Sequence, residues 1–201
     1  MSQCAEKYES ISDAQLIINL QSGSLDALGI IYDRHRGLVF RTAIAITGDS
    51  EAAADLLQDV FLRLYRFAGH IDPLRPLEPW LYRMTTNLSY TWVKRRQRWL
   101  RPLEDVADWL ASTRKDTPAY QAELDDSWRQ VQQAVLSLPL SHRGVVVLYY
   151  VNDLSLQEIS EILDIPVGTV KSRLHYGRQA LKQSLGLIAG DILPDLQYEF
   201  T

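Results

Sequence analysis

The sequence predicts an all-α protein made of two small helical domains joined by a flexible linker, with a helix-turn-helix in the second domain. Three observations predict this fold. Apolar residues recur at helical spacing through nearly the whole chain, and no segment reads convincingly as a strand. Residues 101–118 interrupt the pattern with weak periodicity and mixed polarity, as a linker would. Residues 154–174 combine two short helical patterns with a turn between them.

The composition is that of a globular protein and offers little support for an enzyme. The chain has 201 residues, of which 46% are hydrophobic and 23% are charged. Cys4 is the only cysteine and the N-terminus has no secretory pattern, so we expect a cytoplasmic protein without an internal disulfide. The four histidines are scattered without a second ligand at metal-site spacing, and no nucleophile motif or glycine-rich phosphate loop occurs. We therefore expect no catalysis, no metal and no other cofactor.

The charge is unevenly distributed along the chain. The net charge is −4, yet five of the eight residues from Lys94 to Arg101 are cationic. The stretch Ile165–Lys182 contains four Lys or Arg residues and no carboxylate, whereas residues 102–126 contain seven acids and two bases. Two separate basic segments in an acidic chain suggest two contacts with one polyanion.

The first half reads as a series of helices. Ser12 followed by Gln15 is a capping-box pattern at the start of the first helix. Residues 24–48 read as one or two helices ending near Gly48, and residues 50–68 as one long helix. Residues 69–79 contain three prolines and are expected to form a loop. A further helix is expected from about Glu78 to Arg98.

The helix predicted over residues 50–68 has a polar face with a leucine at its centre. The residues predicted to face the core are Leu57, Val60, Phe61 and Leu64. The opposite stripe contains Asp55, Gln58, Asp59, Leu62 and Arg66. Acidic and amide groups around an exposed leucine favour a protein interface over a nucleic-acid interface.

The helix predicted over residues 78–98 has an apolar stripe and a basic stripe. The apolar stripe is Leu81, Thr85, Leu88 and Trp92. The opposite stripe contains Arg83, Asn87, Tyr90 and Lys94, and continues into Arg95, Arg96 and Arg98. An amide and an aromatic ring among cations suit unstacked, single-stranded bases, which need hydrogen bonds and a stacking surface.

Residues 154–174 have the form of a helix-turn-helix. Ser155 and Glu158 make a second capping box, and Ile165–Pro166 mark the turn. In the second helix Val170, Leu174, Gly177 and Leu181 fall within about 60° of one another at 100° per residue, so they are predicted to form the buried face. Its other faces contain Thr169, Lys171, Ser172, Arg173, Tyr176 and Arg178. Small polar groups flanked by cations are typical of a helix that reads the major groove.

Together these segments resemble the sigma factors of bacterial RNA polymerase, in the extracytoplasmic-function (ECF) group. The similar stretches, in the family's order and spacing, are DLLQDVFLRLYRF, PWLYRMTTNLSYTWVKRR, LSLPLSHRGVVVLYYVNDLS and LSLQEISEILDIPVGTVKSRLHYGRQAL. The resemblance covers about residues 13–185. It implies a promoter-specificity subunit that directs core polymerase to promoters by reading the −35 duplex and capturing unstacked −10 bases.

The resemblance also implies roles for individual residues. Asp55, Gln58 and Asp59, with Leu62 beside them, would bind the clamp helices of the polymerase β′ subunit. Trp80 and Asn87, with the loop at residues 69–79, would frame a flipped −10 base, while Lys94, Arg95 and Arg96 take nearby phosphates. Lys171, Ser172 and Arg173 would contact the −35 duplex. With the stripes above, the expected −10 set is Trp80, Arg83, Asn87, Tyr90, Lys94, Arg95 and Arg96, and the expected −35 set is Thr169, Lys171, Ser172, Arg173, Tyr176 and Arg178.

Two residues depart from the family's pattern. Tyr176 stands where many members have an arginine that reads guanine, so the family's −35 preference is not carried over. Asp164 stands at the turn position that is usually glycine, and its side chain costs about 1 kcal/mol if the backbone there is left-handed.

The implied organisation has four parts. Residues 1–100 form the region 2-like domain, 101–118 the linker, 119–185 the region 4-like domain and 186–201 a tail. The implied partners are core polymerase (β′ clamp helices and β flap), promoter DNA and an anti-sigma factor, often membrane-tethered in the family, and no stable homo-oligomer is expected. On this reading the protein works at the nucleoid, or is held at the membrane by its anti-sigma factor.

Two alternatives stay open from the residues alone. A stand-alone regulator that binds duplex DNA as a dimer explains residues 154–182 but leaves the Asp55 and Arg83 stripes unexplained. A sigma-like decoy that sequesters a partner is the other, and it would support no transcription.

Overall fold

The computed structural model describes residues 11–110 and 126–186, and these residues are all-α, as predicted. The first domain contains α2 (Asp13–Gln21), α3 (Leu25–Thr47), α4 (Ser50–Phe67), the 3-10 turn η1 (Ala68–His70) and α5 (Glu78–Leu110). The second contains α6 (Asp126–Ser137), α7 (Leu140–Tyr150), α8 (Leu156–Leu163) and α9 (Val167–Leu185). No described helix is both long enough and apolar enough to cross a membrane.

Short polar side chains begin the helices of the first domain. Ser12, Ser24 and Asp49 are extended in backbone conformation and accept the backbone N–H three residues on, which satisfies a donor that has no partner within the helix. The capping box expected at Ser12 is present only in part, because the Gln15 side chain donates to Asn19 instead. Gly48 ends α3 at φ 71°, a conformation that favours glycine, so residues 25–47 form one helix.

The helix-turn-helix is formed by α8 and α9 as expected. Ser155 and Glu158 make the full reciprocal capping box, and these hydrogen bonds lower the pKa of the Glu158 carboxyl. Asp164 ends α8 in the left-handed region at φ 54°. In α9 the predicted inner face is buried, and a Cβ on Gly177 would meet Val146 Cγ2 of α7 at 2.7 Å. The glycine therefore permits the close helix approach that the sequence indicated.

Helix α5 is longer than expected. It was predicted to end near Arg98, but it continues to Leu110, so the first ten residues of the expected linker are helical. Pro102 lies inside this helix, where it removes one hydrogen-bond donor. Residues 1–10, 111–125 and 187–201 lie outside the described residues, and with them the rest of the expected linker and nearly all of the expected tail.

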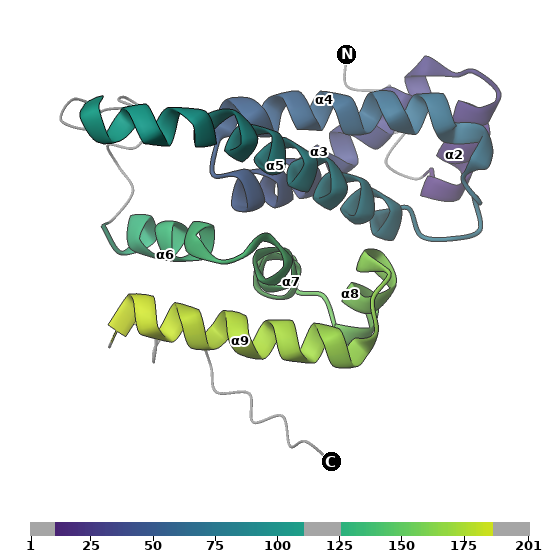
Figure 1. Ribbon diagram of the computed structural model, residues 1–201. Helices are drawn as coiled ribbons and strands as arrows, with labels where there is room; N and C mark the ends of the chain where they lie inside the picture. The colour runs from purple at the N-terminus through teal and green to yellow at the C-terminus, as the bar shows by residue number, and fades with distance from the viewer. Residues whose placement is uncertain (1–10, 111–125, 187–201) are drawn as a thin grey trace.

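The two domains lie against each other as two layers, with α7 and α8 between α5 and α9 (Figure 1). Tyr82 of α5 belongs to the apolar cluster of the second domain, and Leu38 of α3 packs against the clusters of both domains. Arg143 of α7 is 6% exposed and donates to the Ile46 carbonyl of α3 at 2.7 Å. It also donates to the carbonyls of Leu136 and Leu138, so one guanidinium of α7 ties the end of α6 to α3.

Candidate nucleic-acid interface

The polar stripe of α4 is exposed along its whole length. Leu57 is half-buried and Val60, Phe61 and Leu64 are buried, as predicted. The opposite residues, Asp55, Gln58, Asp59, Leu62 and Arg66, are all exposed, and Leu62 is 51% exposed. An exposed leucine flanked by carboxylates suits a protein partner, and the role of this stripe as an interface stays a prediction.

The stripe predicted on α5 is divided in two by the second domain. Asn87 and Lys94 face solvent, as a reading face requires. Arg83 is also exposed, but its guanidinium contacts the second domain, and Tyr90 is half-buried against that domain. Trp80 is half-buried and packs against the core of its own domain.

Arg83 holds the end of α8. Its Nε donates to the Ile162 carbonyl at 2.9 Å, and its Nη2 donates to the Glu161 carbonyl. Both carbonyls lie in the last turn of α8, where a helix has acceptors without intrahelical partners and the negative end of its dipole. Arg83 thus caps a helix of the other domain.

Tyr90 fills a notch left by a glycine. A Cβ on Gly144 of α7 would lie 1.7 Å from the Tyr90 hydroxyl oxygen, so only glycine leaves room for the ring. Burial raises the pKa of Tyr90 to about 12, and the nearby guanidinium groups of Arg173 and Arg143 oppose that rise. Arg173, an expected −35 contact, therefore lies near Tyr90, an expected −10 contact.

The basic end of the reading face lies beyond these contacts. Lys94 and Arg95 are exposed and have no ion pair within the described part of the chain. Arg96 is also exposed, but it pairs with Asp49 at 2.7 Å and its guanidinium lies 5.0 Å from the Trp92 ring centroid. The cluster keeps its positive charge outward, where a phosphate could reach it.

The expected −35 residues on α9 differ in exposure. Ser172 and Tyr176 are exposed, with Tyr176 at 59%, and Thr169, Lys171 and Arg173 are half-buried. Arg178 is held by α7, because its Nε donates to the Tyr150 hydroxyl at 2.7 Å and its guanidinium lies over the rings of Tyr149 and Tyr150. Its role toward DNA stays a prediction.

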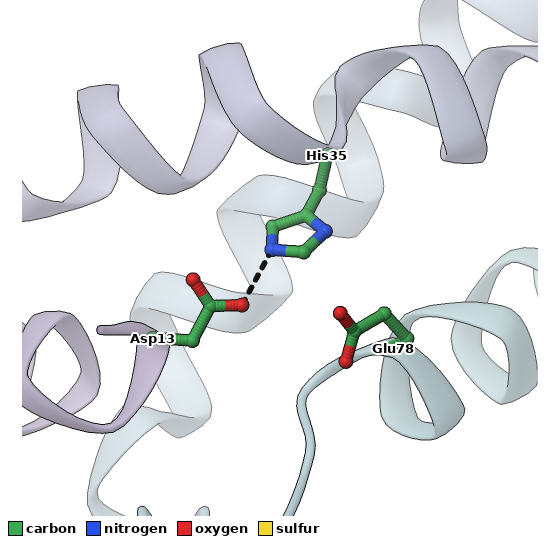
Figure 2. A group of neighbouring side chains, drawn as sticks. All are labelled: Asp13, His35 and Glu78. Atoms are coloured by element: carbon green, nitrogen blue, oxygen red, sulfur yellow. Dashed lines mark hydrogen bonds and ion pairs between the residues drawn. The ribbon is translucent and has the colours of Figure 1, made fainter. Parts of the chain in front are cut away.

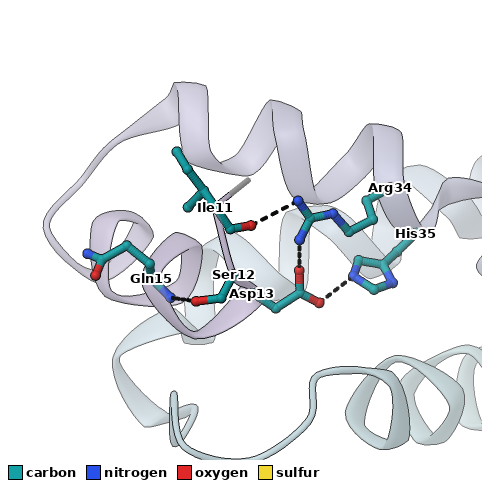
Figure 3. Close-up of polar contacts among 6 residues, drawn as sticks. All are labelled: Ile11, Ser12, Asp13, Gln15, Arg34 and His35. Carbon is teal, nitrogen blue, oxygen red and sulfur yellow. Dashed lines mark hydrogen bonds and ion pairs between the residues drawn. The ribbon is translucent and has the colours of Figure 1, made fainter. Parts of the chain in front are cut away.

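The structure brings one histidine beside two carboxylates that the sequence keeps apart. Candidate ligand atoms of Asp13, His35 and Glu78 lie within 4.8 Å of one another (Figure 2). The buried His35 contacts Asp13 Oδ2 through Nε2 at 2.7 Å. Arg34 donates hydrogen bonds to Asp13 Oδ1 and to the Ile11 carbonyl (Figure 3). A guanidinium on the shared carboxylate would repel a cation. We therefore interpret the cluster as a clasp that ties α2 to α3.

Several residues of this interface were not singled out from the sequence. Gly144, Arg143 and Tyr82 join the domains, and Tyr150 holds Arg178. The only signals were a glycine and an arginine next to the apolar run of α7, and neither indicates by itself which residue it meets.

Two family models match the chain. Sigma-70 region 2 matches residues 31–99, and Sigma-70 region 4 matches residues 128–181. The first match spans α3 to α5, and the second spans the helix-turn-helix.

Curated relatives of this chain are ECF sigma factors. It is 33% identical over 180 residues to the ECF RNA polymerase sigma factor SigW of Bacillus subtilis, and the alignment covers 84% of this chain and 94% of SigW. It is 32% identical over 157 residues to SigL of Mycobacterium tuberculosis, and that alignment covers 77% of this chain and 86% of SigL.

Solved structures share the fold. CnrH, solved in complex with the cytosolic domain of CnrY, matches with a TM-score of 0.62 at 22% identity, over 86% of this chain and 96% of that one. RpoE of Bartonella quintana, solved with the anti-sigma factor NepR, matches with a TM-score of 0.58 at 21% identity, over 76% of this chain and 92% of that one. From the matched regions and these relatives, the chain belongs to the ECF group of RNA polymerase sigma factors, non-enzymatic proteins that direct the polymerase in transcription initiation.

Proposed function

We propose that this sigma factor reads promoters with two separate heads. The outward face of α9 reads the −35 duplex, and α5 with the loop before it captures unstacked −10 bases. The α4 stripe centred on Leu62 binds the clamp helices of β′, and apolar surface of the second domain sits on the β flap. The observation that carries this proposal is that each head lies in a domain with its own apolar cluster.

The arrangement explains why each head can be small. Two weak contacts joined by a connector gain affinity through effective concentration once both domains are docked on the polymerase. Opening the duplex would be driven by stacking and hydrogen bonds to captured bases, each aromatic contact contributing about 1–3 kcal/mol.

A run-off transcription assay on a promoter library tests the proposal. Core polymerase with this protein is expected to start at sites that share −35 and −10 elements, and core polymerase alone is not. Initiation without a shared pair of elements would contradict the two-headed reading. Tight duplex binding without polymerase would instead favour the stand-alone regulator, and core binding without initiation would favour the decoy.

Asn87→Ala separates reading from assembly. Asn87 is exposed on α5, so its loss should leave the fold intact. Permanganate reactivity of −10 thymines should fall while affinity for core polymerase stays unchanged. Normal permanganate reactivity would show that Asn87 does not take part in capturing −10 bases.

We also propose an anti-sigma factor as a partner. CnrH and RpoE were each solved in complex with another protein, in the case of RpoE a named anti-sigma factor. Affinity purification of the tagged chain, followed by mass spectrometry, tests this. A protein that binds the chain and blocks run-off transcription is expected, and complexes that hold core polymerase alone would count against it.

A further inference from the structure

The outward face of α9 carries one large ring among small polar side chains. Tyr176 is 59% exposed, although the apolar side chains on the opposite side of α9 are buried. At 100° per residue, Thr169, Ser172 and Tyr176 fall within about 60° of one another, so they share one face. Tyr176 lies seven residues after Thr169, about two helical turns further along the helix. Its ring is therefore the largest group that this face offers to a base pair.

Two histidine rings contact Tyr176. The ring centroid of His142, on α7, lies 6.4 Å from that of Tyr176, with an interplanar angle of 60°. The ring centroid of His175, the preceding residue on α9, lies 5.5 Å away, with an interplanar angle of 75°. Both arrangements are edge-to-face, which is a favourable geometry for aromatic rings at these distances. The Tyr176 ring is therefore held by a second helix as well as by its own.

The contact from α7 depends on the glycine that follows Tyr176. A Cβ on Gly177 would lie 2.7 Å from Val146 Cγ2 and 3.8 Å from His142 Cβ, so the missing side chain lets α7 pack closely on α9. This close packing brings His142 beside the neighbouring tyrosine. A tyrosine that is already held in place loses little conformational entropy when it binds a partner. Tyr176 is therefore a preorganised contact on an exposed surface.

The chemistry of the ring determines which base it can select. Bidentate recognition of guanine needs two donors for O6 and N7, and tyrosine has a single hydroxyl. That hydroxyl both donates and accepts, so by itself it discriminates poorly among base edges. The ring is apolar, and the apolar group that a base pair presents in the major groove is the C5 methyl of thymine. The same methyl group occurs in 5-methylcytosine, so both bases fit this ring.

We propose that Tyr176, held by His142 and His175, makes one position of the −35 duplex specific for a pyrimidine with a C5 methyl group. The inference rests on the proposed reading of the −35 duplex by α9 and adds the base that one residue selects. Tyr176 is the specificity-determining residue, and His142 is a positioning residue. Thymine at this position should be favoured over uracil by about fourfold, since the two bases differ by one methyl group.

The first test compares the parent with Tyr176→Arg. Core polymerase with the full chain initiates on a promoter library whose −35 element is randomised, and the transcribed promoters are sequenced. The parent should prefer a T·A pair at one −35 position. Tyr176→Arg should change that position alone to G·C, because a guanidinium donates to both O6 and N7 of guanine. Tyr176 is exposed, so circular dichroism should stay unchanged. The same preferences in both proteins would overturn the proposal.

The second test changes the methyl group in the DNA. At the selected position, thymine is replaced by uracil in one template, and cytosine is compared with 5-methylcytosine in another pair. With the parent at limiting concentration, initiation should be about fourfold higher for the methylated base of each pair. With Tyr176→Ala, which removes the ring, both ratios should be close to one. A parent that does not distinguish the members of either pair would overturn the assignment to the methyl group.

The role of His142 is tested by the ratio between thymine and uracil templates. His142→Ala should lower this ratio, because the tyrosine ring loses its contact from α7, while Tyr176→Phe keeps the ring and should keep the ratio. A merely structural role would lower initiation on both templates equally, and an unchanged ratio in His142→Ala would overturn the positioning.

The library also separates this inference from the proposed function. Start sites without any shared −35 element would overturn the proposed reading of the −35 duplex, and this inference with it. A shared −35 element in which no position depends on Tyr176 would overturn only the inference.

Discussion

The outward faces of α4 and α5 belong to the same domain, but they are in different states. The α4 stripe around Leu62 is exposed throughout, whereas on α5 Asn87 is exposed and Tyr90 is half-buried with its hydroxyl enclosed. Both faces carry polar side chains opposite an apolar stripe, so their sequences give no sign of this difference. The comparison teaches that amphipathicity locates a functional face, but it does not tell whether the rest of the chain covers it.

The largest effect is expected for Arg143→Met. Its guanidinium donates to three backbone carbonyls, one of them across the domains, and the substitution leaves these acceptors buried. Urea denaturation should show a loss of about 3 kcal/mol or more in the free energy of unfolding. Arg36→Met is the control, because Arg36 is exposed and its ion pair with Asp33 is 3.9 Å long, so a change within about 0.5 kcal/mol is expected. Equal effects would mean that Arg143 is not an interdomain tie.

The second effect is a pH dependence at Tyr90. Burial raises its pKa to about 12, and an unfolded tyrosine titrates near 10. Its contribution to stability is therefore fully present below about pH 10 and is lost as the pH rises from 10 toward 12. The stability difference between the parent and Tyr90→Phe should change over that window. In Gly144→Ala, where the hydroxyl is released, the same difference should stay flat.

A gain of about 1 kcal/mol is expected for Asp164→Gly. Asp164 adopts φ 54° directly after the last turn of α8, and glycine occupies that region without a Cβ penalty. Thermal unfolding should occur at a higher temperature, and the interdomain distance should stay the same because Arg83 contacts carbonyls and not the Asp164 side chain. Asp153→Gly is the comparison, since Asp153 has φ 53° outside the helix-turn-helix. A destabilised Asp164→Gly would show that this turn depends on its carboxylate.

The smallest effect on stability is expected on the α4 stripe. Asp55→Asn combined with Asp59→Asn changes two exposed groups that have no ion pair among the described residues. The free energy of unfolding should change by no more than about 0.5 kcal/mol, while a pull-down should show weaker binding to core polymerase. Unchanged binding to core polymerase would show that Asp55 and Asp59 do not contribute to the polymerase interface.

Local patterns carried the prediction of the helices and their buried faces. Ser155 and Glu158 lie three residues apart, so their reciprocal bonds follow from the start of one helix. Val170, Leu174, Gly177 and Leu181 recur at helical spacing and are buried together. The predicted end of α5 was wrong for the same local reason, because weak periodicity and mixed polarity from residue 101 onward were interpreted as a linker.

The sequence by itself determined which residues form each helix face, where most helices begin and which surfaces carry charge, because these depend on neighbours a few residues apart. Only the tertiary structure decided which face stays open. Tyr90 meets Gly144, and Arg83 meets the end of α8 nearly 80 residues further on. Such pairings depend on shape and on unsatisfied backbone acceptors that come together only after the helices pack. For this reason the two reading heads could be found in the sequence, but the contact between them could not.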